Sequence, residues 1–422
     1  MKSNVKKLEG TSRQIDIELP RETVDKVFDE VLQDIRKKSQ IPGFRPGKAP
    51  LEMVQKMHQQ DAMDEVARRL VPMAYEQALS KHEMKPVNFP EVTDVNFGPS
   101  GTLTFRAKVD VHPEIKLQKY KGLKVTRKKV SVKDEEVDET LTRFRNMFAE
   151  FTDTDRPIQK GDFGVCAVET FVDGESISKK RENMWIEADK EESMLGLGEE
   201  LCGMNKGDTK DIEATLPKEY PDKKFAGKKA VFRVELKETK EKKLPDVDDE
   251  LAKKLGKDTL AEAREEIKTQ LLERKDQNEK VSMKNQIMGE LLRRHSFALP
   301  PTMVKRQLKV LMDRAENELT KKGVDKDAIK SHEDKLTAQL NVEAENKVRL
   351  YFILDAVADR ENIEVTDEEV DNWLSALAGS YNQPFEEVKK YYEEHDLIGG
   401  LKEQLREEKT LDFLLSEAAV SD

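Results

Sequence analysis

The first hundred residues combine strand patterns with helix patterns. Apolar and polar residues alternate over residues 14–19 and 102–111, and this period of two predicts half-buried strands. Over residues 24–35 the apolar positions recur at helical spacing, and residues 51–79 predict one or two further helices. We therefore expect residues 1–112 to form a small α+β domain in which a sheet packs against helices.

The rest of the chain divides by pattern into a connector, a β-rich module and a helical part. Residues 113–150 predict a connector with one short amphipathic helix. Residues 151–244 carry short apolar runs separated by turn signals such as Asp173-Gly174, which predicts a compact β-rich module. Residues 245–422 are almost entirely helical in pattern, and Thr366 with Glu369 forms a capping box.

Composition adds shape and charge to this picture. The chain is 36% hydrophobic and 38% charged, which predicts elongated helical parts with much solvated surface. The expected class is therefore α+β multidomain, ending in an elongated all-α domain. A formal net charge of −11 argues against general binding to nucleic acid, because phosphates repel an acidic surface.

Several kinds of site are not expected. The two cysteines, Cys166 and Cys202, and the scattered histidines offer no metal-ligand spacing, so no metal is expected. No phosphate-binding glycine motif occurs, which predicts a protein without cofactor that works without ATP. The first ten residues lack the apolar core of a signal peptide, and no window approaches about 18 apolar residues, so we expect a cytoplasmic protein with no membrane contact.

One basic segment stands out against the acidic balance. Residues 36–48 carry five cations and no acidic residue. Glycines and prolines in its second half cannot continue a helix, so a loop is expected with Phe44 near its tip. An exposed Phe44 beside Arg45 and Lys48 could bury in a partner and bind phosphate or carboxylate groups. The alternative is an ordinary helix–helix turn in which Phe44 folds back into the core.

The run Gly43-Phe44-Arg45-x-Gly47-Lys48-x-Pro50 resembles the ribosome-binding signature of the bacterial trigger factor family. Residues 244–256 resemble the segment that follows that family's central module. The resemblance implies a chaperone that docks beside the polypeptide exit of the large ribosomal subunit, contacts protein and ribosomal RNA there, shields nascent chains, and assists folding, export and cell division. It assigns ribosome binding to Gly43, Phe44, Arg45 and Lys48. It also implies a weak homodimer off the ribosome.

The central module is similar to the FK506-binding proteins (FKBPs), a family of peptidyl-prolyl cis-trans isomerases. Residues 171–175, 201–208 and 216–221 carry this likeness. By position, the resemblance assigns the catalytic cleft to Trp185, Leu195, Leu197, Tyr220 and Phe232. Val168 and Leu197 stand where the family usually has aromatic residues, and residues 189–193 replace its glycine-rich turn. We hypothesise that the module binds peptides and isomerises them slowly.

Two rival functions remain open at this point. The protein could be mainly a prolyl isomerase, which needs a complete aromatic cleft. It could instead be an assembly chaperone that works away from the ribosome, which would leave the basic Phe44 loop without a role. The long helices allow a similar choice. Their charged faces fit either plain salt-bridged arms or a cradle whose scattered apolar patches hold unfolded chains.

Overall fold

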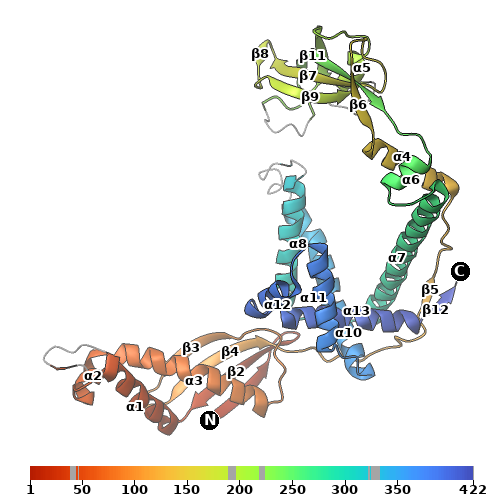
Figure 1. Ribbon diagram of the computed structural model, residues 1–422. Coiled ribbons are helices and arrows are strands. Elements are labelled where there is room, and N and C mark those ends of the chain that lie inside the picture. Colours follow the sequence, from red (N-terminus) through yellow and green to blue (C-terminus); the bar gives the residue numbers. More distant parts are fainter. Residues whose placement is uncertain are drawn as a thin grey trace. The chain divides into compact units, whose positions relative to one another are not determined.

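The computed structural model describes residues 1–38, 44–45, 47–188, 196–217, 224–321, 324 and 333–421 of the 422-residue chain (Figure 1). The chain divides into two compact units. The first comprises Met1–Val125, Lys284–Arg314 and Glu333–Ala419, and the second comprises Thr126–Met283, Ala315–His332 and Val420–Asp422. Among the described helices, none has the length and apolar character needed to cross a membrane.

The first unit begins with an antiparallel four-stranded sheet in the order β1-β2-β4-β3. Its strands are β1 (Lys2–Lys7), β2 (Ser12–Leu19), β3 (Glu91–Phe97) and β4 (Leu103–Asp110). Its helices are α1 (Arg21–Lys38), α2 (Leu51–Met57) and α3 (Gln59–Lys81). The predicted α+β class is confirmed. The strand predictions missed β1 and β3, because these edge strands carry mostly polar side chains that give no buried period.

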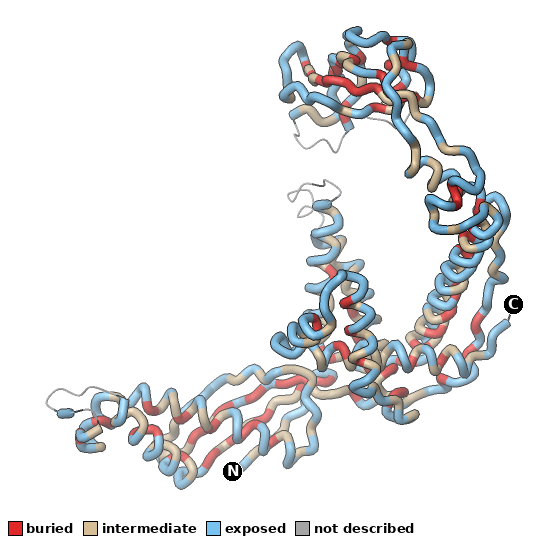
Figure 2. Tube along the Cα trace, viewed as in Figure 1, coloured by how far each residue is buried: buried red, intermediate tan, exposed pale blue. Residues whose placement is uncertain are grey.

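The core of this sheet lies on one face. Ile17 pairs with Phe105 across β2 and β4, and both side chains are at most 2% exposed. Val31 of α1 and Val66 of α3 are fully buried in the same cluster. Figure 2 shows the buried residues gathered along the central strands and the facing helices. Alternation in the strands and the helical stripe thus bury one common face, as the sequence pattern predicts.

The helical body of the first unit follows the predicted pattern. Its helices are α8 (Pro301–Lys321, in this unit to Arg314), α10 (Glu333–Glu361), α11 (Asp367–Ser380), α12 (Phe385–Glu394) and α13 (Ile398–Ser416). The capping box at the start of α11 is present: Thr366 Oγ1 accepts from Glu369 N–H, and Glu369 accepts from Thr366 N–H. Phe352 of α10 and Leu374 of α11 are fully buried.

Polar contacts join the sheet domain to the helical body. The buried Asp110 carboxylate accepts hydrogen bonds from Ser12 Oγ, at 2.6 Å, and from the N–H and hydroxyl of Thr302, at 3.1 and 2.6 Å. Asp110, at the end of β4, thereby caps the N-terminus of α8. Burial acts to raise the pKa of Asp110, but these hydrogen bonds outweigh it and hold the pKa below its ordinary value. His112 Nε2 lies 3.3 Å from a carboxylate oxygen of Asp355 in α10.

The connector begins with a short strand that pairs with the end of the chain. β5 (Lys124–Thr126) forms a two-stranded sheet with β12 (Ala419–Ser421). Gly122 N–H donates to Glu417 O at 3.0 Å, and Ala419 N–H donates to Leu123 O at 2.8 Å. Nearby, the buried His295 accepts from Gln118 N–H at 2.9 Å. These bonds fix the first part of the connector to the helical body.

The second unit contains the β-rich module. Its six-stranded sheet has the order β10-β11-β7-β8, with β6 paired to β11 and β9 paired to β7. The strands are β6 (Glu150–Thr154), β7 (Phe163–Val172), β8 (Glu175–Ser176), β9 (Arg181–Glu187), β10 (Thr209–Thr215) and β11 (Lys229–Lys243). A short helix, α5 (Leu197–Leu201), covers the buried face. Asp173 and Gly174 have positive φ at the β7–β8 turn, as a tight hairpin requires.

Helices complete the second unit. They are α4 (Asp134–Met147), α6 (Asp249–Lys254) and α7 (Leu260–Arg294), of which the part up to Met283 belongs here. Val137 and Leu141 of α4 pack against Ile267 and Leu271 of α7. The amphipathic helix predicted in the connector is therefore present, and its apolar stripe is buried against the long charged helix.

Candidate docking loop and isomerase module

A backbone hydrogen bond joins the two ends of the basic loop, which leaves the sheet domain after α1 and returns to it before α2. Gly47 N–H donates to the carbonyl of Arg36 at the end of α1, at 3.0 Å. Lys48 N–H donates to Arg45 O at 3.0 Å, which closes a tight turn. Gly47 has a φ of +79°, a conformation that glycine adopts without strain. Ala49 is buried in the domain core, so the loop is anchored immediately after its basic residues.

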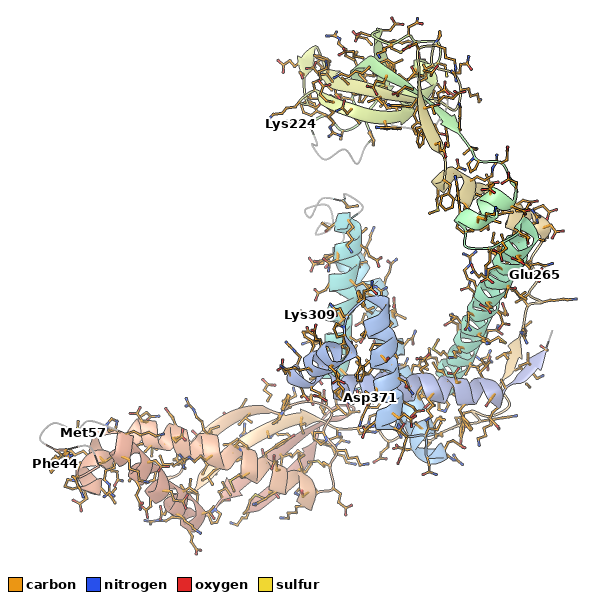
Figure 3. The ribbon with its side chains drawn as sticks, in the orientation of Figure 1. Phe44, Met57, Lys224, Glu265, Lys309 and Asp371 are labelled. Atoms are coloured by element: carbon orange, nitrogen blue, oxygen red, sulfur yellow. The ribbon has the colours of Figure 1, made fainter. Side chains whose placement is uncertain are left out.

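Phe44 is exposed at this loop. Its side chain is 39% exposed and does not belong to the domain core, and the neighbouring Arg45 and Lys48 are exposed as well. Figure 3 shows Phe44 at the end of the domain where α1 and α2 meet the loop. The last turn of α1 adds Arg36, Lys37 and Lys38 to this end. The geometry thus presents an aromatic ring among cations. Gly43, the remaining residue assigned to ribosome binding, lies outside the described residues.

Sequence reasoning missed two residues at this end. Met53 and Met57 of α2 are 43% and 53% exposed, while Val54 between them is buried. Figure 3 shows Met57 at the same end of the domain as Phe44. The two methionines stand four residues apart, so they share one helical face. That spacing was a usable signal, since an i,i+4 apolar pair opposite the core position predicts a second, exposed apolar stripe.

The β-rich module brings two of its predicted site residues together. Leu197, which opens α5, is fully buried, and Phe232 of β11 is 5% exposed. Both belong to one core cluster with Ile186 of β9. Gly196 holds the N-cap position of α5 with a φ of +81°, which turns the chain into the helix. Leu197 and Phe232 therefore share the buried face of the sheet.

Trp185 does not join them, contrary to the expected lining. It pairs with Val165 of β7, and its neighbour Ile186 points into the core. Because successive side chains in a strand point to opposite faces, Trp185 lies on the outer face, 49% exposed. There its ring meets Phe151 edge-on at 5.2 Å between centroids and Phe163 at 6.1 Å. Strand pairing, which sequence position could not supply, decides the face.

Leu195 and Tyr220, the other two predicted lining residues, lie outside the described residues. The structure points instead to apolar side chains that are only partly buried against the same core. They are Ile177, Met184, Ala214 and Phe225. Met184 is the neighbour of Trp185, so a shift of one residue along β9 separates the outer face from the core face. The alternation of Met184, Trp185 and Ile186 was the signal that sequence reasoning overlooked.

The module's buried cysteine is not a nucleophile. Cys166 lies in the middle of β7 and is fully buried in the core cluster. Burial raises the pKa of its thiol to about 12, so the thiolate is rare near neutral pH. Prolyl isomerisation needs rotation about an amide and no covalent intermediate. The chemistry that this module can supply is therefore a shaped apolar surface for a proline-containing segment.

Comparison with known families matches all three parts of this architecture. The profile described as "Bacterial trigger factor protein (TF)" matches residues 1–144, and that described as "Bacterial trigger factor protein (TF) C-terminus" matches residues 259–416. The profile "FKBP-type peptidyl-prolyl cis-trans isomerase" matches residues 154–237. Docking domain, isomerase module and helical body are thus each matched in the order in which the fold presents them.

Similar proteins share this full length. A trigger factor of Geobacillus thermodenitrificans is 34% identical over 431 residues, covering 98% of each chain. A trigger factor of Carboxydothermus hydrogenoformans is 33% identical over 426 residues, covering 99% of each chain. A solved structure, from work on promiscuous substrate recognition in folding and assembly by the trigger factor chaperone, has a TM-score of 0.52 at 22% identity. It covers 99% of this chain and 100% of that chain, and it shows the fold alone.

These findings define a multidomain folding chaperone with a built-in FKBP-type peptidyl-prolyl cis-trans isomerase domain. Sequence identity above 30% over nearly the whole of both chains shows the family as well. The chain belongs to the bacterial trigger factor family. Its N-terminal domain is the ribosome-binding domain of that family. The expected class and general function are confirmed.

Proposed function

We propose that this chain docks at the polypeptide exit of the large ribosomal subunit through Phe44, Arg45 and Lys48, with Gly43 at the start of the same loop. Docked there, it shields nascent chains in the cytoplasm and releases them without ATP, which assists their folding and export. Away from the ribosome it self-associates weakly. Residues 1–112 serve as the docking domain, 151–244 as the isomerase module, and 113–150 with 245–422 as the chaperone body.

The exposure of Phe44 on an anchored loop is the observation that supports docking most strongly. Exposing an aromatic ring to water is unfavourable, and a partner that buries it regains that free energy. Backbone hydrogen bonds already hold Gly47 and Lys48, so fixing these two residues on binding costs little conformational entropy. Arg45 supplies a planar guanidinium for phosphate or carboxylate groups, and Lys48 adds a second positive charge. Salt should therefore weaken the complex.

The helical body supports the shielding of unfolded chains. Several of its large apolar side chains are exposed, each separated by charged positions. They include Val310 of α8, Val342 of α10, Tyr381, which follows α11, Tyr391 of α12 and Leu397, which precedes α13. Scattered patches of this kind bind an apolar segment weakly, because each contact buries a small area. Weak contacts allow release without nucleotide hydrolysis, since dissociation rates rise as affinity falls.

For the isomerase module, we propose that Met184 and Phe225, which are only partly buried, contact the peptide, and that the buried Leu197 and Phe232 of the same core cluster hold them in place. Leu195 and Tyr220 keep the role that family position assigns to them. Aliphatic residues at Val168 and Leu197 leave fewer rings beside a proline, so isomerisation should be slow while peptides still bind. A protease-free assay with a proline peptide tests this. A catalysed isomerisation rate within about tenfold of that of an ordinary FK506-binding protein would contradict slow catalysis.

Ribosome co-sedimentation tests the docking proposal. The variant Phe44→Ala/Arg45→Ala/Lys48→Ala should stay in the supernatant, with affinity lowered at least about tenfold, because it loses an aromatic anchor and two cations. Wild type should pellet with large subunits, and less so as salt rises. If wild type and variant bind equally, the loop is only a turn. If neither binds, the protein works away from the ribosome.

A matched control comes from the same domain. Phe89 is 95% exposed, and Lys85 and Lys108 are exposed cations. The variant Phe89→Ala/Lys85→Ala/Lys108→Ala removes one ring and two charges, as the loop variant does, but leaves the loop intact. It should pellet like wild type. An equal loss in both variants would show that ribosome binding depends on net charge and exposed apolar area rather than on this loop.

A further inference from the structure

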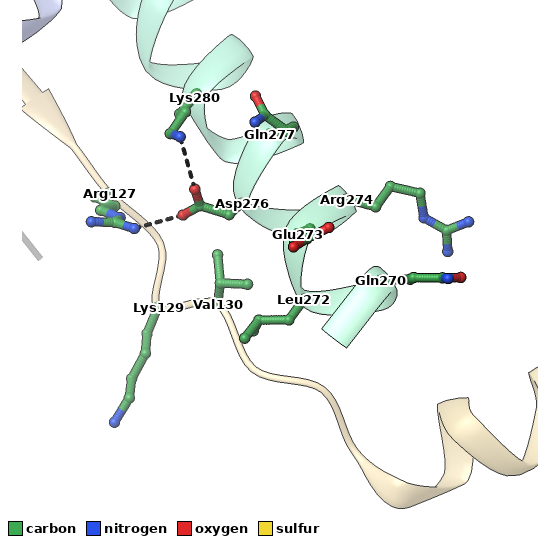
Figure 4. Close-up of a pocket in the computed structure, with 10 residues that line it drawn as sticks. All are labelled: Arg127, Lys129, Val130, Gln270, Leu272, Glu273, Arg274, Asp276, Gln277 and Lys280. Atoms are coloured by element: carbon green, nitrogen blue, oxygen red, sulfur yellow. Dashed lines mark hydrogen bonds and ion pairs between the residues drawn. The ribbon is translucent and has the colours of Figure 1, made fainter. Parts of the chain in front are cut away.

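A groove runs between the connector and α7 in the second unit. It has a volume of about 1090 Å³, and Lys129, Val130, Leu272 and Arg274 are among its lining residues. Figure 4 shows Val130 of the connector and Leu272 of α7 pointing toward one another, with Lys129 on the connector side and Arg274 beyond Leu272. This groove is distinct from the docking loop and from the core of the isomerase module.

The walls of the groove are fixed to each other by polar contacts. Lys128 N–H donates to Glu279 Oε1 at 2.8 Å, and Glu279 is buried. Arg127 Nη2 donates to Asp276 Oδ1 at 2.7 Å, and Lys275 Nζ donates to Ser131 O at 2.8 Å. Main-chain and side-chain bonds thus hold the connector along one side of α7. A groove held in this way is preformed, so a ligand need not order it.

Val130 and Leu272 form the floor of the groove, which is apolar and accessible to solvent. Leu272 is 45% exposed although it sits in a long helix whose other leucines pack inward, such as Leu271 in the core with α4. Val130 is half-buried beside it. Water on such surface is released when an apolar group covers it, which favours binding of a partner with aliphatic side chains.

Charges around this floor are mainly positive. Lys129 of the connector and Arg274 of α7 line the groove and are exposed, and neither has an ion pair within the parts of the chain that the structure describes. Of the two carboxylates that line the groove, Asp276 and Glu273, only Asp276 is neutralised by ion pairs. Asp276 is bound by Arg127 and by Lys280 at 3.2 Å, and these contacts lower the pKa of Asp276 below its ordinary value.

Two further carboxylates complete the electrostatic picture. Lys275 binds Glu136 at 2.7 Å, and this contact lowers the pKa of Glu136. Glu273 also lines the groove and reduces, without cancelling, the positive charge of Lys129 and Arg274. The four lining cations, which are Arg127, Lys129, Arg274 and Lys280, outnumber the two lining carboxylates. The groove is therefore a locally positive surface on a chain of net charge −11.

We propose that this groove binds acidic segments of unfolded polypeptides in which Asp or Glu residues stand next to aliphatic ones. The partner's class, an unfolded chain, rests on the proposed chaperone function. An aliphatic side chain covers Val130 and Leu272 while flanking carboxylates meet Lys129 and Arg274. Elsewhere the acidic surface repels such segments, so this groove extends the range of chains that the protein can hold.

The lining favours a polypeptide over a nucleic acid. Binding to single strands usually combines cations with aromatic rings on which bases stack. No aromatic residue is among the residues that line the described groove, whereas two aliphatic residues form its floor. Carboxylate and aliphatic groups together match both properties of the surface, and a phosphate backbone would match only its charge.

Fluorescence anisotropy with three labelled peptides of equal length tests the proposal. One alternates Glu with Leu, one Gln with Leu, and one Lys with Leu. The variant Lys129→Gln/Arg274→Gln should bind the Glu peptide about fivefold more weakly and the Gln peptide within about twofold of wild type. Raising the salt concentration should reduce this difference, because exposed charges are screened. Leu272→Ser should weaken both the Glu and the Gln peptides.

The matched control is Lys26→Gln/Lys81→Gln, which removes two exposed cations from α1 and α3. It should leave all three peptides unchanged. Equal weakening by both double variants would overturn the proposal in favour of a general charge effect, and so would failure of wild type to prefer the Glu peptide. If the groove variant instead loses binding to an oligouridylate probe and keeps the Glu peptide, the groove serves nucleic acid. Ribosome co-sedimentation of the groove variant should match wild type, which separates this result from a failure of docking.

Discussion

The loop around Phe44 and the isomerase module place the side chains proposed to be functional in opposite ways. In the loop, Phe44, Arg45 and Lys48 come from one short stretch. One backbone hydrogen bond, from Gly47 to Arg36, holds this stretch to the end of α1, and a second, from Lys48 to Arg45, closes a turn within it. In the module, Leu197 and Phe232 come from a helix and a distant strand and are buried in the core that stabilises the fold. The loop leaves its ring exposed to solvent, whereas the module uses rings and aliphatic groups for packing.

This difference has a physical consequence for how function and stability are coupled. A side chain that is exposed on an anchored turn contributes little to the free energy of unfolding, so it can be changed without loss of fold. A side chain in a packed core contributes to both packing and the binding surface, so a change affects both. Function should therefore be separable from stability in the loop and inseparable in the module.

Replacing Phe232 should give the largest effect. Phe232→Ala is expected to lower the free energy of unfolding of the module by about 3–5 kcal/mol, because it removes a buried ring and leaves a cavity. Urea unfolding followed by Trp185 fluorescence measures this in a Trp373→Phe background, since these are the two tryptophans. Phe44→Ala should change stability by no more than about 0.5 kcal/mol. A comparable loss in both variants would break the comparison.

Asp110 tests whether a side chain in a long-range polar contact contributes to stability, as the buried side chains of the module do. Asp110→Ala should lower stability by about 2 kcal/mol at neutral pH, because Ser12, Thr302 and the start of α8 lose their acceptor. The folded-state pKa of Asp110 is lowered, so this contribution is present above its ordinary pKa of 3.8 and is lost as the pH falls through the folded value. Thermal unfolding of wild type and variant should therefore converge in acid.

Asp94 provides the control for that experiment. Its carboxylate is 52% exposed and binds Arg106 at 2.7 Å. Asp94→Asn should cost less than about 1 kcal/mol, since water screens an exposed ion pair. Asparagine is used because it tolerates the φ of +53° at this position, which would strain an alanine. If Asp110→Ala is as mild as Asp94→Asn, the cap on α8 does not stabilise the first unit.

Gly47 tests whether ribosome binding depends on the backbone conformation of the loop. Gly47→Ala should weaken ribosome binding by about twofold to tenfold, because a φ of +79° strains an alanine by about 1 kcal/mol. Apart from its chain neighbours, no described residue has a heavy atom within 4 Å of a Cβ added at Gly47, so the expected effect is one of backbone conformation. Gly47→Asn should be milder, since asparagine tolerates this region better. Equal binding by all three proteins in co-sedimentation would show that the loop rearranges on the ribosome.

The smallest effect is expected at Trp185. Trp185→Ala should keep the isomerase rate within about twofold of wild type, because its ring lies on the outer face of the sheet with Phe151 and Phe163. Met184→Ala, one residue away on the core face, should lower the rate more. A protease-free proline-peptide assay compares the two. Greater loss from Trp185→Ala would move the peptide site to the outer face.

The sequence predicted the loop well because the loop is local. Phe44, Arg45 and Lys48 are neighbours in the chain, and glycine and proline enforce a turn there whatever the rest of the fold does. Most helices and the inner strands were also predictable, since β2, β4 and β7 alternate or run apolar between turns. The long charged helix α7 and the capping box at Thr366 follow from local rules of the same kind.

The parts that the sequence missed depend on distant partners. The face that Trp185 occupies is set by its pairing with Val165, and a shift of one residue reverses it. The cap that Asp110 places on α8 joins residues 192 apart, which no local pattern predicts. The edge strands β1 and β3 and the exposed pair Met53 and Met57 were overlooked because polar strands and short helices give weak periodic signals.

The pairing of β5 with β12 determines the order in which parts of this chain can fold during its own synthesis. The sheet domain can close once Asp110 has left the ribosome, because all of its strands precede that residue. β5 must wait for β12, which is made about 300 residues later, a delay on the order of 15–60 s at about 5–20 residues per second. The sheet domain can thus fold while the helical body is still being synthesised, and β5 gains its partner strand only after residues 419–421 have emerged.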